Sequence, residues 1–75
     1  MIYIFTCNEK YKKLAIYELE KFDRSFQFRE WLDKEVGLFE SELESQQLKN
    51  LIVCTPIIFV RHLFKVDGFI KKKII

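Results

Sequence analysis

The chain opens with a short extended segment and one amphipathic helix. Residues 2–7 are mostly β-branched and aromatic, which predicts a strand with two apolar faces. A helix to about residue 22 should follow, because apolar side chains recur there at helical spacing. Thr6 and Glu9 form a capping-box pattern before it, and Asn8 is a second candidate cap. The predicted buried stripe of this helix consists of Tyr11, Leu14, Ala15, Leu19 and Phe22.

Two strands should come next. After a turn at residues 23–25, apolar and polar positions alternate over 26–32, which is the period of a strand. Residues 38–41 predict a short strand that forms a hairpin with it. Gly37 lies in the connection, where it could take a positive φ.

A second helix and a last strand complete the pattern. Ser41 and Glu44 form another capping box, so a helix should begin just after Ser41 and end before Pro56. The apolar stretch 57–66 predicts a fourth strand. An Asp-Gly turn follows it, and a further strand is expected to start at Phe69.

This order, β-α-β-β-α-β, predicts an α+β fold. Two βαβ-like halves in so short a chain indicate a ferredoxin-like sandwich, with a four-stranded antiparallel sheet and two helices on one face. We expect residues 1–67 to form this domain and residues 68–75 to begin a linker or the next strand. The second face of the sheet is then open.

The alternation assigns side chains to the two faces. If the isoleucines of the first strand face the helices, Tyr3 and Phe5 lie on the open face, with Arg29 and Trp31 of the next strand beside them. Aromatic rings interleaved with basic side chains on a bare sheet would stack RNA bases and hold phosphates.

On the last strand, the more apolar alternate set should face the helices. This puts Phe59, Arg61 and Lys65 on the open face, although a shift of one residue would exchange Arg61 for His62. The lysine run near the end of the chain is a further candidate for phosphate contacts. The candidate RNA-binding residues are Arg29, Trp31, Arg61, Lys65, Lys71, Lys72 and Lys73.

Docking is the alternative role for the open face. Apolar side chains on a sheet face more often indicate an interface than a nucleotide site, so a structural interaction domain is the second hypothesis. Its partner would be a catalytic domain of the same protein or a second copy of this chain.

Composition narrows the classes of function. A net charge of +2 is weak evidence for a nucleic-acid partner. Cys7, Cys54 and the single histidine, His62, are too few for a zinc site or a disulfide framework, so we expect free thiols, no metal and a cytoplasmic location. The sequence has no run near the ~20 apolar residues of a membrane span. No catalytic motif can be identified, and His62 is expected to be structural.

The two ends of the sequence differ. Met1 has the character of a natural start, and the short apolar run after it does not predict a signal peptide. The sequence stops at an apolar pair, Ile74 and Ile75, directly after the lysine run. We therefore expect the N-terminal piece of a longer protein.

Three segments carry a family resemblance: Phe5-Thr6-Cys7-Asn8-Glu9 with the Leu-Ala helix after it, Val36-Gly37-Leu38-Phe39-Glu40-Ser41, and Phe59-Val60-Arg61-His62. Together they resemble the N-terminal ferredoxin-like region of THUMP-associated, RlmM/FtsJ-like RNA methyltransferases. The chain departs from that pattern at Tyr11, where glycine is usual, and at Lys65, where proline is common.

The resemblance implies an RNA-recognition or positioning domain that is non-catalytic by itself. It would precede a Rossmann-type catalytic domain that uses S-adenosylmethionine, and the substrate would be structured rRNA or tRNA. No catalytic or cofactor-binding residue is carried over, because that domain would lie beyond Ile75.

Overall fold

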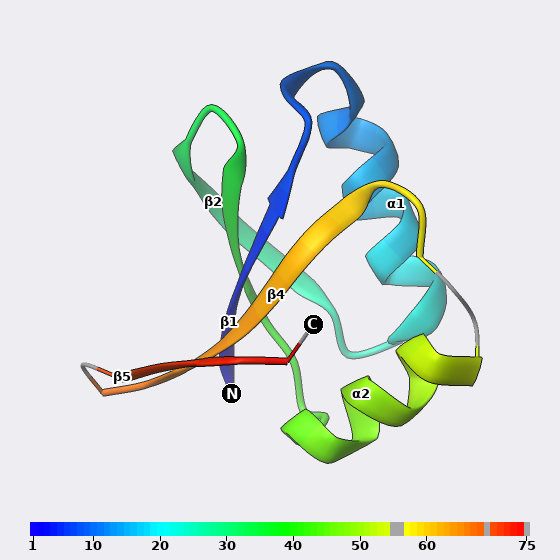
Figure 1. Ribbon diagram of the computed structural model, residues 1–75, viewed down its shortest axis with the longest axis vertical. Coiled ribbons are helices and arrows are strands. Elements are labelled where there is room, and N and C mark those ends of the chain that lie inside the picture. Colours follow the sequence, from blue (N-terminus) through cyan, green and yellow to red (C-terminus); the bar gives the residue numbers. More distant parts are fainter. Residues whose placement is uncertain (55–56, 69, 75) are drawn as a thin grey trace.

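The computed structural model describes residues 1–54, 57–68 and 70–74. The predicted helix stop at Pro56 and strand start at Phe69 lie outside these residues. Strands and helices follow one another along the chain as shown in Figure 1. They are β1 (Ile2–Cys7), a 3-10 turn (Glu9–Tyr11), α1 (Lys12–Phe22), β2 (Gln27–Asp33), β3 (Val36–Glu40), α2 (Ser45–Cys54), β4 (Val60–Asp67) and β5 (Ile70–Lys73).

The predicted α+β, ferredoxin-like fold is confirmed. The strands form one antiparallel sheet in the order β2-β3-β1-β4-β5, and both helices lie on one side of it (Figure 1). β5 pairs with β4 and widens the sheet by one strand. The chain reaches β5 through Gly68, whose φ of 63° lies in the left-handed region that favours glycine.

The two faces of β1 are the reverse of the prediction. Tyr3 and Phe5 are fully buried in the cluster that the sheet forms with Ala15 and Leu19 of α1 and with Leu48 of α2. The large rings fill the space between sheet and helices. The hydroxyl of the buried Tyr3 ring keeps a hydrogen-bond partner, because it donates to the Leu43 carbonyl at 2.5 Å.

β4 is reversed as well. Lys65 is in register with buried Tyr3, and Leu63 is in register with buried Phe5, so Lys65 is on the helix-facing side rather than the open face. His62 and Phe64 take the open face, which is the one-residue exchange that the sequence left open.

A bulge marks the start of β4. Thr6 is in register with His62 while Cys7 is in register with Val60, so Arg61 is an extra residue in the ladder. The bulge lets both Val60 and Leu63 reach the core.

Phe39 of β3 is the centre of the aromatic core. Its ring centroid lies 5.3 Å from that of Tyr3, 5.9 Å from that of Phe5 and 4.7 Å from that of Phe26. Gly37 does not have a positive φ, so the predicted role in a turn is wrong. Its lack of a side chain makes room for the aromatic packing instead. A Cβ at Gly37 would lie 2.5 Å from the ring of Phe5.

The candidate cap at Asn8 is confirmed, and the two predicted capping boxes are not formed. The Asn8 side chain accepts from the Lys10 amide at 2.9 Å, whereas Thr6 lies within β1 and its buried hydroxyl has no partner. α2 begins at Ser45, later than predicted. Ser41 is held in the preceding turn because its hydroxyl bonds to Asp23 and accepts from the Leu43 amide.

The two thiols should differ sharply in reactivity. Cys7 and Cys54 are free, the first buried and the second exposed. Burial raises the pKa of the Cys7 thiol above its ordinary 9.0, although Lys12 and Arg61 pull this pKa down. At about pH 8 we expect a thiol reagent to label Cys54 rapidly and Cys7 only in denaturant. Equal labelling rates in the folded chain would contradict this packing.

The same pKa shift has a consequence for stability. Above the ordinary thiol pKa of 9.0, the unfolded chain releases a proton that the folded chain retains at Cys7. Stability is therefore complete below that pH and falls as the pH rises through the raised pKa. Tyr3 acts in the same direction from its ordinary 10.0, because burial raises its pKa too.

Candidate nucleic-acid interface

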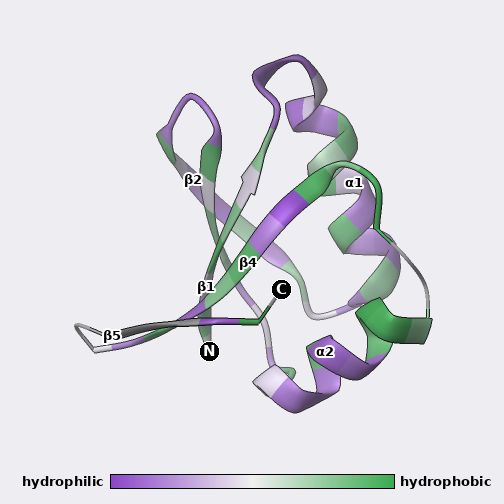
Figure 2. Ribbon diagram, viewed as in Figure 1, coloured by the Kyte–Doolittle hydropathy of each residue, from purple (hydrophilic) through white to green (hydrophobic). Residues whose placement is uncertain are grey.

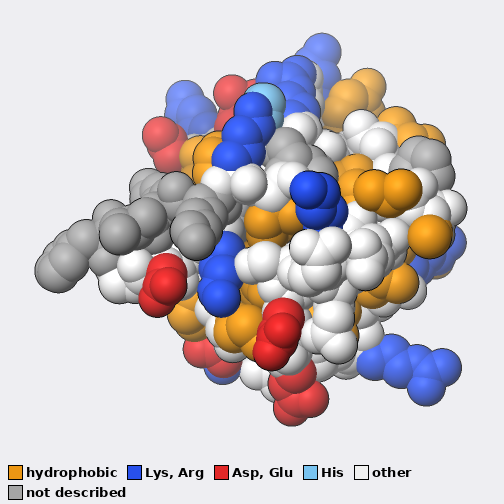
Figure 3. Space-filling model, turned by 60° about the horizontal axis from the view of Figure 1, so that its bottom comes forward, with side chains coloured by type: hydrophobic (Ala, Val, Ile, Leu, Met, Phe, Trp, Pro, Cys, Tyr) orange, Lys and Arg blue, Asp and Glu red, His pale blue; other side chains and the backbone are white. Residues whose placement is uncertain are grey.

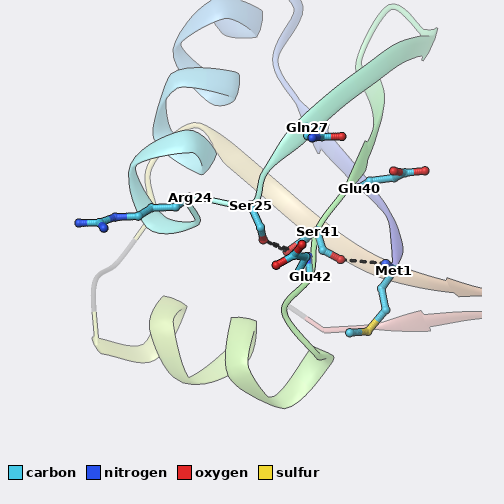
Figure 4. Close-up of a pocket in the computed structure, with 7 residues that line it drawn as sticks. All are labelled: Met1, Arg24, Ser25, Gln27, Glu40, Ser41 and Glu42. Atoms are coloured by element: carbon cyan, nitrogen blue, oxygen red, sulfur yellow. Dashed lines mark hydrogen bonds between the residues drawn. The ribbon is translucent and has the colours of Figure 1, made fainter.

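A hollow of about 500 Å³ lies beside the start of β2 and the end of β3. Figure 4 shows Arg24 pointing away from it and the Ser25 and Ser41 hydroxyls pointing at each other. Behind them, buried Asp23 accepts from the Ser25 amide at 2.8 Å and hydroxyl at 2.6 Å, and from the Ser41 hydroxyl. These groups satisfy one another and join the turn after α1 to the turn after β3. This network is structural.

A second hollow, of about 320 Å³, lies at the end of β1. We call it the β1-end hollow, and it is lined by Asn8, Tyr11, Ile58, Phe59 and Arg61. The rings of Tyr11 and Phe59 lie 5.6 Å apart and are tilted by 43°. Tyr11 is 45% exposed and Ile58 80% exposed, so solvent reaches the apolar wall directly.

Glu18 of α1 fixes the segment that forms one side of the β1-end hollow. Its carboxylate accepts from the backbone amides of Ile58 at 2.7 Å, Phe59 at 3.1 Å and Val60 at 3.2 Å. Ile58 and Phe59 precede β4, and Val60 begins it in register with Cys7 of β1. The anchor therefore sets the positions of Phe59 and of Arg61 just after it.

Several basic residues belong to the segments around the β1-end hollow. The charges of Lys12 and Arg61 both lower the pKa of the Cys7 thiol, at the last residue of β1. Lys10 belongs to the turn that Asn8 caps, and its side chain is exposed. Figure 3 shows Lys and Arg side chains gathered along the upper edge of the molecule, next to exposed apolar side chains.

The chain was also compared with other proteins. No protein-family model, curated protein or solved structure matches it.

No cluster of metal-ligating side chains is found in the described ranges. Within residues 1–54, 57–68 and 70–74, no three His, Cys, Asp or Glu side chains are grouped to hold a metal ion. No helix among these residues is long and apolar enough to cross a membrane.

Two of the predicted RNA-binding residues, Arg29 and Trp31, lie on β2, and neither is free on the open face. Arg29 occupies a bulge and pairs with Glu40, so its guanidinium is already engaged. Trp31 faces the helices and not the open face, which corrects the prediction. Its ring meets Phe5 edge-on at 5.5 Å, and the Lys12 amine lies 4.5 Å from its centroid.

The predicted basic residues of β4 and β5 are also dispersed. Lys65 lies across from Lys72 of β5 on the helix-facing side, away from the β1-end hollow. Lys73 is exposed at the end of β5, and the side chains of Lys71 and Lys72 are outside the described part. Of the seven predicted residues, Arg61 alone lines the β1-end hollow among those whose side chains are described.

Sequence reasoning grouped Phe59 with Arg61 but missed Tyr11 and Asn8 as their neighbours. Tyr11 was assigned to the buried stripe of α1, and Asn8 was considered only as a cap. The signal that could have found them is local: Tyr11 lies between two lysines, and Phe59 lies two residues before Arg61. Paired aromatic and basic residues of this kind are typical of nucleic-acid contacts.

Proposed function

We propose that this chain is an RNA-recognition domain that binds single-stranded RNA at the β1-end hollow and is non-catalytic by itself. The observation that supports this is the position of exposed Arg61 beside the rings of Tyr11 and Phe59. A base would stack on the exposed Tyr11 ring, and the guanidinium of Arg61 would hold a phosphate or stack on the next base. The Asn8 side-chain NH2 would donate to a base edge, while its oxygen stays bonded to the Lys10 amide.

The wider context of the proposal comes from the family resemblance. The domain would position structured rRNA or tRNA for a methyltransferase domain that follows Ile75 in the same protein. S-adenosylmethionine would be bound by that domain, and no residue of this chain is proposed to hold it. A cytoplasmic location belongs to the same proposal and agrees with the free Cys7 and Cys54 thiols.

Binding should weaken when the β1-end hollow is altered. Tyr11→Ala removes a stacking platform worth about 1–3 kcal/mol per base, so we expect about tenfold weaker binding of a stem-loop RNA. Arg61→Ala should weaken it similarly and lower the salt slope of log K by about 1, because one phosphate contact is lost. Fluorescence anisotropy of a labelled stem-loop, measured from about 50 to 200 mM salt, gives both quantities.

Matched variants control for loss of aromatic area and of charge elsewhere. Tyr17→Ala removes an exposed ring from α1, and Arg24→Ala removes an exposed charge beyond the far end of α1. Both should leave RNA affinity within about twofold. The duplex stem alone should bind more weakly than the stem-loop, because its bases are not free to stack. No binding of either RNA at low salt would refute the proposed function.

A further inference from the structure

The open face of the sheet has an apolar centre that no helix covers. Three neighbouring strands contribute to it, in the order β3, β1, β4. Ile4 is in register with Leu38 on one side and Phe64 on the other, and Ile2 is in register with Val66. Neighbours on the sheet bury Ile4 to 7% exposure, and the other four side chains are partly exposed. Figure 2 shows mostly hydrophobic residues along β1 and more hydrophilic residues along β2.

The two flanks of this face carry opposite net charge, because Arg29 and Glu40 on the β2 side form an ion pair and cancel. On β2, Glu30 is in register with Leu38 and Asp33 with Val36, and both carboxylates are exposed. On β5, Lys73 is in register with Phe64, which places it on the same face, and its side chain is exposed. One row across the sheet therefore runs from Glu30 through Leu38, Ile4 and Phe64 to Lys73.

This row is complementary to itself under one kind of symmetry. A two-fold axis in the interface and parallel to the strands reverses the order of the strands but keeps each residue at its height along them. It sets Ile4 against Ile4 of the second copy and Leu38 against Phe64. It also sets Glu30 against Lys73 at both flanks.

We propose that two copies of this chain associate face to face through the open face of the sheet, about such an axis. The two sheets would pack as a sandwich with the apolar centre between them, about 10 Å apart. The row from Glu30 to Lys73 is about 19 Å wide, and β1 spans about 14 Å between Ile2 and Thr6. As a flat rectangle this face covers about 270 Å², well below the ~800 Å² that each partner of a standard interface buries, so we expect a weak dimer that dissociates at micromolar concentrations. The β1-end hollow stays free in this arrangement.

The charge pattern favours a second copy over another occupant. An acidic flank, an apolar centre and a basic flank at matching heights make a surface that is its own complement. The inference does not rest on RNA binding, because the two sites share no residue.

Charge reversal tests the arrangement. Sedimentation velocity from about 10 µM to 1 mM should show the unaltered chain passing from monomer to dimer. Glu30→Lys and Lys73→Glu each put like charges at both flanks, so each variant alone should dimerise at least about tenfold more weakly. An equal mixture of the two variants restores attraction at both flanks, and it should form a heterodimer about as strongly as the unaltered chain.

Two control variants and three possible results test the face-to-face dimer. Glu20→Lys and Lys13→Glu, both on α1, make the same charge changes at exposed positions away from the open face, and both should dimerise normally. A chain that stays monomeric at 1 mM would overturn the proposal. A dimer that both reversals leave unchanged, or that the mixture fails to restore, would overturn the face-to-face arrangement. None of these results depends on RNA, so failure here is distinct from failure at the β1-end hollow.

Discussion

Replacing Phe39 with alanine is expected to lower the free energy of unfolding by about 3–5 kcal/mol. The ring is fully buried and packs against Tyr3, Phe5 and Phe26, so its loss leaves a cavity shared by β1, β3 and the turn before β2. A domain of this size has only about 3–5 kcal/mol of core stability, so the variant should be largely unfolded at room temperature.

Urea unfolding followed by the fluorescence of Trp31 measures this loss, because the indole packs against Phe5 and Phe28 of the same core. Tyr17→Ala is the matched control. Its ring is 56% exposed, and its removal should change stability by no more than about 0.5 kcal/mol. A Phe39→Ala chain that still unfolds cooperatively near the original midpoint would mean that Phe39 is not at the centre of the core.

Replacing Glu18 with alanine should cost about 2–3 kcal/mol. The carboxylate is the acceptor for the amides of Ile58, Phe59 and Val60. Val60 is 4% exposed, so water cannot readily replace the acceptor there, and a buried donor left without a partner costs about 1–3 kcal/mol. Glu18→Gln keeps an acceptor oxygen and should cost less.

Loss of the Glu18 anchor should also reach the proposed RNA site. Phe59 and Arg61 lie on the segment that it positions, so Glu18→Ala should weaken RNA binding at a temperature where the chain is still folded. Glu20→Ala, an exposed change on the same helix, controls for the loss of a negative charge. If Glu18→Ala matches Glu20→Ala in urea midpoint and in RNA affinity, the anchor has no energetic role.

The sequence was sufficient for the order of the elements and for the fold. Helical spacing in α1, strand alternation in β2 and the Asp-Gly turn before β5 are local signals, and the order of elements limits the topology to few choices. Sheet faces were harder, because both sides of β1 are apolar and alternation alone cannot distinguish them. Packing decides the matter: the rings of Tyr3 and Phe5 fill the wide gap under the helices, and Ile2 and Ile4 suit the shallower face.

The site was only partly accessible to sequence reasoning. Arg61 was a candidate, but the bulge that makes it an extra residue of β4 comes from a register shift against Thr6 and Cys7. No local pattern encodes such a shift, since it depends on how two distant strands meet. Trp31 was misplaced for a related reason, because bulges on either side of it change the alternation along β2.

The irregular edges of the sheet limit how this chain can polymerise. The ladder between β2 and β3 is interrupted between Phe28 and Glu30 and again between Trp31 and Asp33, which bends the outer strand and breaks its row of free amides and carbonyls. The opposite edge, β5, contains three consecutive lysines. Both features hinder strand addition, the step by which sheets grow into fibrils. Self-association through the face uses one surface per copy, so it closes at two chains and yields a finite particle.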